Sequence, residues 1–133
     1  MSNLYHGSVV RNLKTLEPRK RYTPSQTIEY AAIYATPLPG FAAAHSFAWS
    51  SDEGVELDVE NGKVTMLIPE TLKERLSIPI SIYTLPPDTF ELTKEEGTGA
   101  TWHSTQPVNI LQEKKYSSVL EALTENGVEL TFK

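Results

Sequence analysis

The chain has 133 residues, which is the size of one globular domain spanning residues 1–133. Its formal net charge is −5. It has no cysteine, which excludes disulfides, thiol nucleophiles and thiolate ligands, and its three histidines form no metal-binding pattern, so we expect no metal. No apolar run is long enough to span a membrane and the first residues lack the features of a signal peptide, so we expect a cytoplasmic protein that contacts no membrane.

The charge is unevenly distributed along the chain. The first 21 residues carry five basic side chains and one acidic one, whereas the remainder is strongly acidic. This distribution does not predict a protein that coats nucleic acid. It is compatible with local binding of one anionic group, or simply with a solvated loop.

The first third of the chain predicts short strands separated by irregular segments and one helix. Leu4–His6 predicts a strand that stops at Gly7-Ser8, and Val9–Pro24 predicts a loop because it is polar and contains two prolines. Ile33–Thr36 predicts a buried strand. The alanine-rich segment Pro39–Trp49 predicts a helix with proline in its first turn.

A hairpin is the clearest element in the middle of the chain. Val55–Val59 alternates apolar and acidic residues, and Asn61-Gly62 is a preferred pair for a type I′ turn. Val64–Ile68 is continuously apolar, which predicts a returning strand in a central position of the sheet.

The last part of the chain predicts further strands and one capped helix. Ser118 and Glu121 have the spacing of a capping box, and Gly127 ends the helix that they open. The other expected elements are a helical turn in Pro69–Leu76, strands at Ile80–Leu85, Phe90–Thr93, Val108–Leu111 and Val128–Phe132, and a glycine-rich loop at Glu95–Ala100. These elements predict an α+β fold with a mostly antiparallel, split sheet and few short helices.

Three clusters of residues, far apart in the sequence, have side chains suited to ligand binding. Tyr5–Ser8 places an imidazole beside the open backbone of a glycine. Tyr34 on a strand, with His45 and Phe47 on the next helix, offers aromatic rings to clamp a planar ring. Thr101–Val108 follows the glycine-rich loop. Each cluster also has a structural alternative: a strand end with a surface histidine, core aromatics, and a loop anchored by a tryptophan.

Taken together, the three clusters resemble the ADP-ribosyltransferase-like fold. His6-Gly7-Ser8 at a strand end, then Tyr34-Ala35-Thr36 before an alanine-rich helix, then a late strand, follow the order of its His–Tyr–Glu branch. That branch includes poly(ADP-ribose) polymerases and diphtheria-like toxins. The stretch from Trp102 to Val108, with Gly127–Leu130, is similar to small bacterial and phage proteins of this fold.

The resemblance implies that NAD is the ligand and assigns a role to several residues. His6 would bind the ribose, Gly7 would hold the nicotinamide amide through its backbone, and Ser8 would lie beside them. Tyr34 would lie against the nicotinamide, with Phe47 as the second aromatic. The basic segment from Arg11 to Arg21 would lie near the pyrophosphate, since guanidinium groups pair with phosphate oxygens.

The third family residue is a glutamate that stabilises the positive charge developing on the ribose. Its position matches Thr101, with Gln106 as the other polar candidate, and neither side chain carries a charge. Glu95 and Glu96 in the preceding loop are further candidates. Such an electrostatic contribution is worth about 3 kcal/mol or more, so its loss predicts weak catalysis.

Two functions follow from this resemblance. The first is a protein that binds NAD or a related nucleotide and transfers ADP-ribose, weakly or not at all, to an unknown acceptor, either protein or nucleic acid. The related tRNA 2′-phosphotransferases use NAD without the glutamate and rely on arginines and a histidine; Arg11, Arg19 and Arg21 are available here. The alternative is a non-catalytic module that binds a protein or nucleic acid. In the first case, His6, Tyr34 and Thr101–Gln106 should line one cleft.

Overall fold

The structure, a computed structural model, describes residues 2–19, 31–93 and 100–133, and its α+β class confirms the prediction. Two short α-helices and two 3₁₀-helices accompany the strands, and no helix in the described ranges is long and apolar enough to cross a membrane. In chain order the elements are β1 (Leu4–Ser8), β2 (Thr15–Leu16), β3 (Ile33–Ala35), α1 (Pro39–Ala44), η1 (Ser51–Glu53), β4 (Glu56–Glu60), β5 (Lys63–Ile68), η2 (Glu70–Ser77), β6 (Ile80–Leu85), β7 (Glu91–Leu92), β8 (Trp102–Ser104), β9 (Val108–Asn109), β10 (Gln112–Tyr116), α2 (Val119–Glu125) and β11 (Glu129–Phe132).

The strands form several small sheets, which confirms the split, mostly antiparallel arrangement. Three sheets of three strands have the orders β1-β6-β10, β11-β5-β4 and β3-β8-β7, and β2 pairs with β9. Every pair is antiparallel except β11 with β5, which is parallel. The C-terminal strand therefore joins a sheet that begins with a local hairpin.

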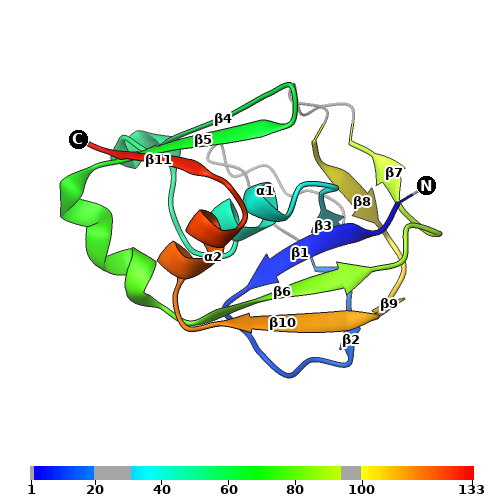
Figure 1. Ribbon diagram of the computed structural model, residues 1–133. Coiled ribbons are helices and arrows are strands. Elements are labelled where there is room, and N and C mark those ends of the chain that lie inside the picture. Colours follow the sequence, from blue (N-terminus) through cyan, green and yellow to red (C-terminus); the bar gives the residue numbers. More distant parts are fainter. Residues whose placement is uncertain (1, 20–30, 94–99) are drawn as a thin grey trace.

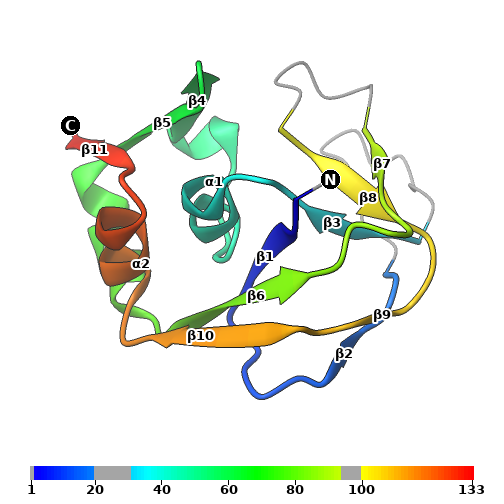
Figure 2. The same ribbon diagram turned by 45° about the vertical axis from the view of Figure 1, so that its right-hand side comes forward.

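The two α-helices lie between two of these sheets. Figures 1 and 2 show α1 and α2 side by side, with β4, β5 and β11 on one side and β1, β6 and β10 on the other. A large apolar cluster fills this layer, from Phe41 of α1 to Leu123 of α2. A second cluster, which includes Leu4, Tyr83 and Phe90, packs on the opposite face of β1 and β6. Strands β1 and β6 are thus covered on both faces.

The predicted hairpin is confirmed. Glu60 pairs with Lys63, so Asn61 and Gly62 form a two-residue turn, and their φ angles of 52° and 79° are both positive, as a type I′ turn requires. Strand β5 lies between β4 and β11, in the central position that its apolar run predicts. The capped helix is also confirmed, because Ser118 Oγ accepts the N–H of Glu121 at 3.0 Å and Gly127 follows the helix with φ 74°.

Other elements differ from the prediction. Helix α1 ends at Ala44 rather than Trp49, because side chains take the carbonyl groups of its last turn: Ser46 Oγ donates to Ala43 O and the Trp49 indole donates to Ala44 O, each at 2.6 Å. Strand β2 lies inside the expected loop, and β8 and β10 were not expected at all. The remainder of that loop beyond residue 19, and the glycine-rich segment 94–99, lie outside the described residues.

The segment between β1 and β2 is attached to the face of the β1-β6-β10 sheet. The hydroxyl of the buried Tyr83 donates to Val10 O at 2.7 Å and accepts the Leu13 N–H at 3.3 Å. One carboxylate oxygen of Glu113 accepts the Asn12 N–H at 2.9 Å and the Ser81 hydroxyl at 2.6 Å. Burial opposes ionisation of Glu113, but these hydrogen bonds, together with the charge of Lys115, outweigh it and lower its pKa.

We expect Gly62→Val to lower the free energy of unfolding by about 1 kcal/mol or more, because a β-branched residue resists positive φ. No atom lies near the site of an added Cβ, so the cost comes from the backbone rather than from a clash. Urea unfolding measures the change. Lys63→Val, at an exposed position beside the turn, is the control for β-branching alone. An unchanged stability in Gly62→Val would contradict the type I′ assignment.

Candidate functional site

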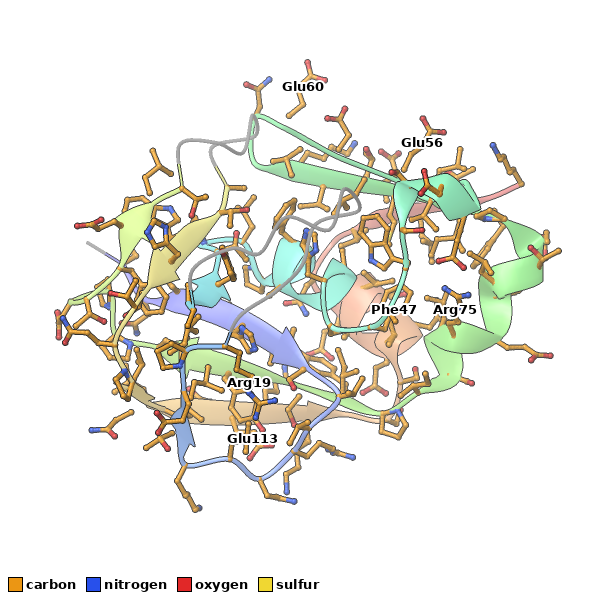
Figure 3. The ribbon with its side chains drawn as sticks, turned by 180° about the vertical axis from the view of Figure 1, so that it is seen from behind. Arg19, Phe47, Glu56, Glu60, Arg75 and Glu113 are labelled. Atoms are coloured by element: carbon orange, nitrogen blue, oxygen red, sulfur yellow. The ribbon has the colours of Figure 1, made fainter. Side chains whose placement is uncertain are left out.

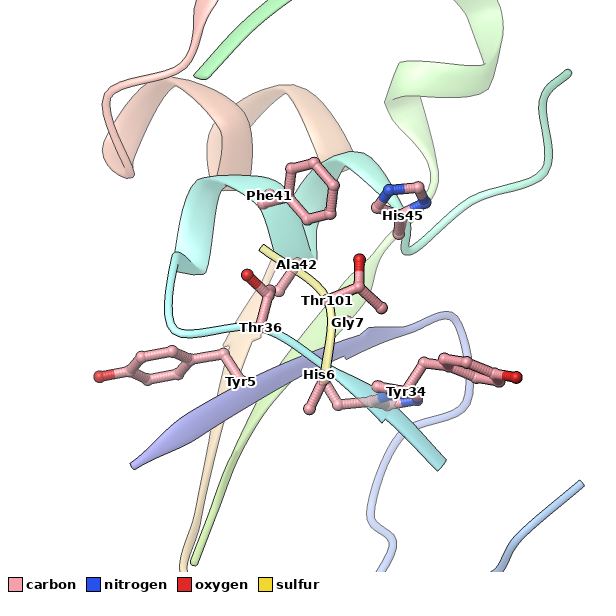
Figure 4. Close-up of a pocket in the computed structure, with 10 residues that line it drawn as sticks. Tyr5, His6, Gly7, Tyr34, Thr36, Phe41, Ala42, His45 and Thr101 are labelled. Atoms are coloured by element: carbon pink, nitrogen blue, oxygen red, sulfur yellow. The ribbon is translucent and has the colours of Figure 1, made fainter. Parts of the chain in front are cut away.

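A pocket of about 180 Å³ opens between α1 and the strands β1 and β3; we call it the near pocket. In Figure 4 the rings of Phe41 and His45 lie on its α1 side, and those of His6 and Tyr34 lie on its strand side. Its lining residues are Tyr5, His6, Gly7, Tyr34, Ala35, Thr36, Phe41, Ala42, His45 and Thr101. Sites for drug-sized ligands are commonly about 300–1,000 Å³, so this pocket has room for one substituted ring.

The near pocket lies where β1 and β3 separate. Tyr5 N–H donates to Thr36 O at 2.7 Å, and Thr36 N–H donates to Tyr5 O at 2.9 Å. These two bonds form an isolated bridge that joins β1 to the residue after β3. Beyond it, β1 continues along β6 and β3 along β8. Successive residues of a strand direct their N–H and C=O to opposite edges, so those of Gly7 face the same edge as those of Tyr5. Gly7 therefore presents one donor and one acceptor to the near pocket.

The imidazole of His6 spans the separation of the two strands. Its Nδ1 lies 2.7 Å from Tyr34 O, and because a carbonyl oxygen only accepts, Nδ1 carries the proton and donates. Burial lowers the pKa of His6; the bond to Tyr34 opposes this, and the charge of Arg19 lowers the pKa further. His6 is thus a neutral side chain whose Nε2 is an acceptor.

Gly7 is required by packing as well as by its position at the pocket. A Cβ at this residue would lie 2.2 Å from Ala42 O and 2.9 Å from the Cβ of Ser46. Such a distance to a backbone oxygen is not compatible with any side chain, so only glycine lets α1 approach β1 this closely. The sequence alone suggested close approach of a ligand, whereas the structure shows close approach of a helix.

The aromatic residues that α1 contributes are Phe41 and His45, not Phe47. Phe41 and His45 are one helical turn apart, with ring centroids at 4.6 Å, and His45 stacks on Trp49 at 5.7 Å. Phe47 is 7% exposed and belongs to the large apolar cluster, outside the near pocket. The resemblance assigned the second aromatic to Phe47 on the following helix, but the helix ends before Phe47.

Thr101 also lines the near pocket. It is 9% exposed, and its carbonyl accepts the Thr93 N–H at 2.9 Å, which joins the chain on either side of the segment 94–99. The expectation that His6, Tyr34 and the segment starting at Thr101 line one cleft is therefore confirmed for Thr101. Gln106 is exposed, bonds through its backbone to Ser104 Oγ and does not line the near pocket. Glu95 and Glu96 lie outside the described residues.

Tyr34 is attached to the strand that follows Thr101. It pairs with His103 across β3 and β8, with ring centroids at 6.4 Å, and His103 Nδ1 lies 2.8 Å from the hydroxyl oxygen of Thr93. Thr93 in turn bonds Thr101 through its backbone. The Tyr34 and Thr101 sides of the near pocket are thereby held by one short network.

A second hollow, of about 390 Å³, shares His6 and Tyr34 with the near pocket; we call it the far pocket. Ser8, Glu17 and Arg19 line it together with His6 and Tyr34. Figure 3 shows Arg19 on the side of the molecule where Glu113 also lies. Arg11, predicted near the pyrophosphate, lines neither pocket, and its buried Nε has no hydrogen-bond partner among the described residues. Lys20 and Arg21 lie outside the described residues.

The sequence predicted no ligand contact for five lining residues, although three of them lie in the quoted motifs: Tyr5, Ala35, Thr36, Phe41 and Ala42. The one-turn spacing of Phe41 and His45 is the signal that would have identified Phe41. Tyr5 and Thr36 reach the pocket through strand pairing over long sequence separation, which leaves no local signal. The described residues contain no group of three or more His, Asp or Glu side chains arranged for a metal ion.

The lowered pKa of His6 predicts a pH-dependent stability. Between the folded pKa and the ordinary value of about 6.5, the unfolded chain binds a proton that the folded chain does not. The free energy of unfolding should therefore fall as the pH drops below about 6.5, by at most about 1.4 kcal/mol per pH unit, and not change from this cause above it. In His6→Asn, whose amide can still donate to Tyr34 O, this contribution should vanish. A wild-type minus variant difference that is constant from about pH 7.5 to pH 5 in urea unfolding would contradict the assignment.

In comparisons with known proteins, no family model matches the chain, and no curated protein and no solved structure is significantly similar to it. The function is therefore inferred from the residues and geometry of the two pockets.

Proposed function

We propose that this protein binds NAD or a related dinucleotide through its nicotinamide ring, as a domain of the ADP-ribosyltransferase-like type. The observation that carries this proposal is that His6, Gly7, Tyr34 and Thr101, from three distant segments, line one ring-sized pocket. These are the positions that the resemblance assigns to the ligand. Their meeting at one place supports the proposal.

The chemistry of the near pocket suits a ring that carries a carboxamide. The edge of Gly7 offers one N–H donor and one C=O acceptor, which matches the carbonyl and the NH₂ of an amide. The rings of Tyr34 and Phe41 offer faces for stacking on a planar ring. His6 Nε2, as an acceptor, suits a ribose hydroxyl.

The far pocket suits the remainder of a dinucleotide. A 180 Å³ hollow does not hold a dinucleotide, and the larger hollow begins at the same His6–Tyr34 pair. Arg19 lines it and offers a guanidinium for phosphate oxygens, and Ser8 lies beside it.

The reaction that the fold type supports, cleavage of the bond between nicotinamide and ribose, is expected to be weak here. Thr101, which the resemblance matches to the family glutamate, lines the near pocket and offers a hydroxyl without charge. Positive charge developing on the ribose would therefore lack a carboxylate partner from this position. We propose binding as the main activity and transfer of ADP-ribose to an acceptor as a slow one.

Tyr34→Ala should abolish NAD binding, measured by calorimetry, because it removes a stacking face. Tyr34→Phe is the matched control: it keeps the ring and should bind with near-native affinity. His6→Ala should weaken binding by about 1 kcal/mol for one neutral hydrogen bond, or more if its partner stays buried and unpaired. A folded wild-type protein that binds neither NAD nor nicotinamide would overturn the proposal and favour an interaction module.

Thr101→Glu should raise NAD hydrolysis above the wild-type rate, since it places a carboxylate in the near pocket. Gln106→Glu adds the same charge at an exposed position outside the pocket and should leave hydrolysis unchanged. The hydrolysis rate of each variant is measured by chromatography as the rate of nicotinamide release. Robust hydrolysis by the wild-type protein would show that another group performs the role expected at this position.

A further inference from the structure

The near pocket combines aromatic rings, methyl groups and hydroxyls. Phe41 and Tyr34 contribute rings, Ala35 and Ala42 contribute methyl groups, and Thr36 and Thr101 contribute hydroxyls. None of the ten described residues that line it is an aspartate, glutamate, lysine or arginine. The described walls thus provide hydrogen bonds and apolar contact for a ring without providing an opposite charge.

A positive charge lies near the His6 side of the near pocket. Arg19, on the far pocket, is close enough to His6 to lower the pKa of that imidazole. Glu17 also lines the far pocket, but it does not contribute to the shift of His6. The field at the His6 side of the near pocket therefore disfavours a second positive charge.

A cationic ring and a neutral ring of the same shape should bind to the near pocket with different free energies. The cation loses hydration on entering the pocket and gains no ion pair from the described walls, and it is repelled by Arg19. Attraction to the faces of Phe41 and Tyr34 offsets part of that cost. A neutral ring gains the same stacking and the same amide hydrogen bonds without the loss of ion hydration.

We propose that the near pocket selects an uncharged aromatic or dihydropyridine carboxamide over its cationic counterpart, so that a reduced nicotinamide dinucleotide binds more tightly than the oxidised one. This inference rests on the proposed function, because it concerns the ring that enters the same pocket. It predicts that the protein responds to the reduced form of the dinucleotide, or to free nicotinamide, rather than consuming the oxidised form.

Two pairs of probes test the selectivity by calorimetry on the wild-type protein. 1-Methylnicotinamide and 3-methylbenzamide have the same shape and differ by a ring nitrogen with a positive charge, and the neutral member should bind at least tenfold more tightly. NADH should likewise bind at least tenfold more tightly than NAD. The small pair isolates ring charge from the adenosine and phosphates, and the dinucleotide pair tests the same preference in the whole ligand.

Variants test the origin of the selectivity. Arg19 is exposed, so Arg19→Gln should fold normally and narrow the preference for the neutral probe, whereas Arg19→Lys keeps the charge and should retain it. Thr101→Glu should reverse the preference, and Thr101→Gln, of similar size without charge, should not.

The outcomes separate the two proposals. Equal or tighter binding of the cationic member in both pairs would overturn the selectivity and leave the proposed function standing. Absence of binding for all four probes, with a folded protein, would overturn the proposed function and the selectivity with it. Tighter binding of both neutral members supports both proposals, whether or not the Thr101 variants fold.

Discussion

The separation of β1 from β3 after a single backbone bridge is the constraint on which the site depends. Paired strands satisfy the backbone N–H and C=O groups of each other. Where two strands separate, these groups need other hydrogen-bond partners. The imidazole of His6 takes one carbonyl, that of Tyr34, and thereby fixes its own tautomer. The backbone of Gly7 remains directed at the gap. The same separation opens a pocket, orients a histidine and leaves the Gly7 backbone at the pocket wall.

The close contact of α1 with β1 keeps this arrangement in place. Because Gly7 has no side chain, the Ala42 carbonyl packs directly against β1. Phe41 of α1 and His45 at its C-cap therefore reach the near pocket. The end of the helix is set by the side chains of Ser46 and Trp49, which occupy its last carbonyl groups. The position of the helix and its length therefore both follow from short-range hydrogen bonds and one missing methyl group.

How far the sequence predicted this structure depended on whether a signal was local. Asn61-Gly62 and Ser118 specify a turn and a cap through their own backbone and side chains, and both were predictable. The strands β8 and β10 lack such signals, because Trp102–Ser104 is very short, Gln112–Tyr116 is mostly polar, and both pair with partners distant in sequence. The resemblance brought His6, Gly7, Tyr34 and Thr101 to one place, and all four line the near pocket. Phe47 was assigned in place of Phe41 because the helix was expected to extend to Trp49, whereas it ends at Ala44.

The parallel pairing of β11 with β5 has a consequence for how the protein is made. The hairpin of β4 and β5 lies near the middle of the chain, yet the second edge of β5 receives its partner only from residues 129–132. During synthesis on the ribosome that edge stays unpaired until the last strand emerges, and an unpaired apolar strand is a template for association with other chains. Contacts over such sequence separation also slow folding. Nascent chains that stop after β10 are therefore expected to be the aggregation-prone species of this protein.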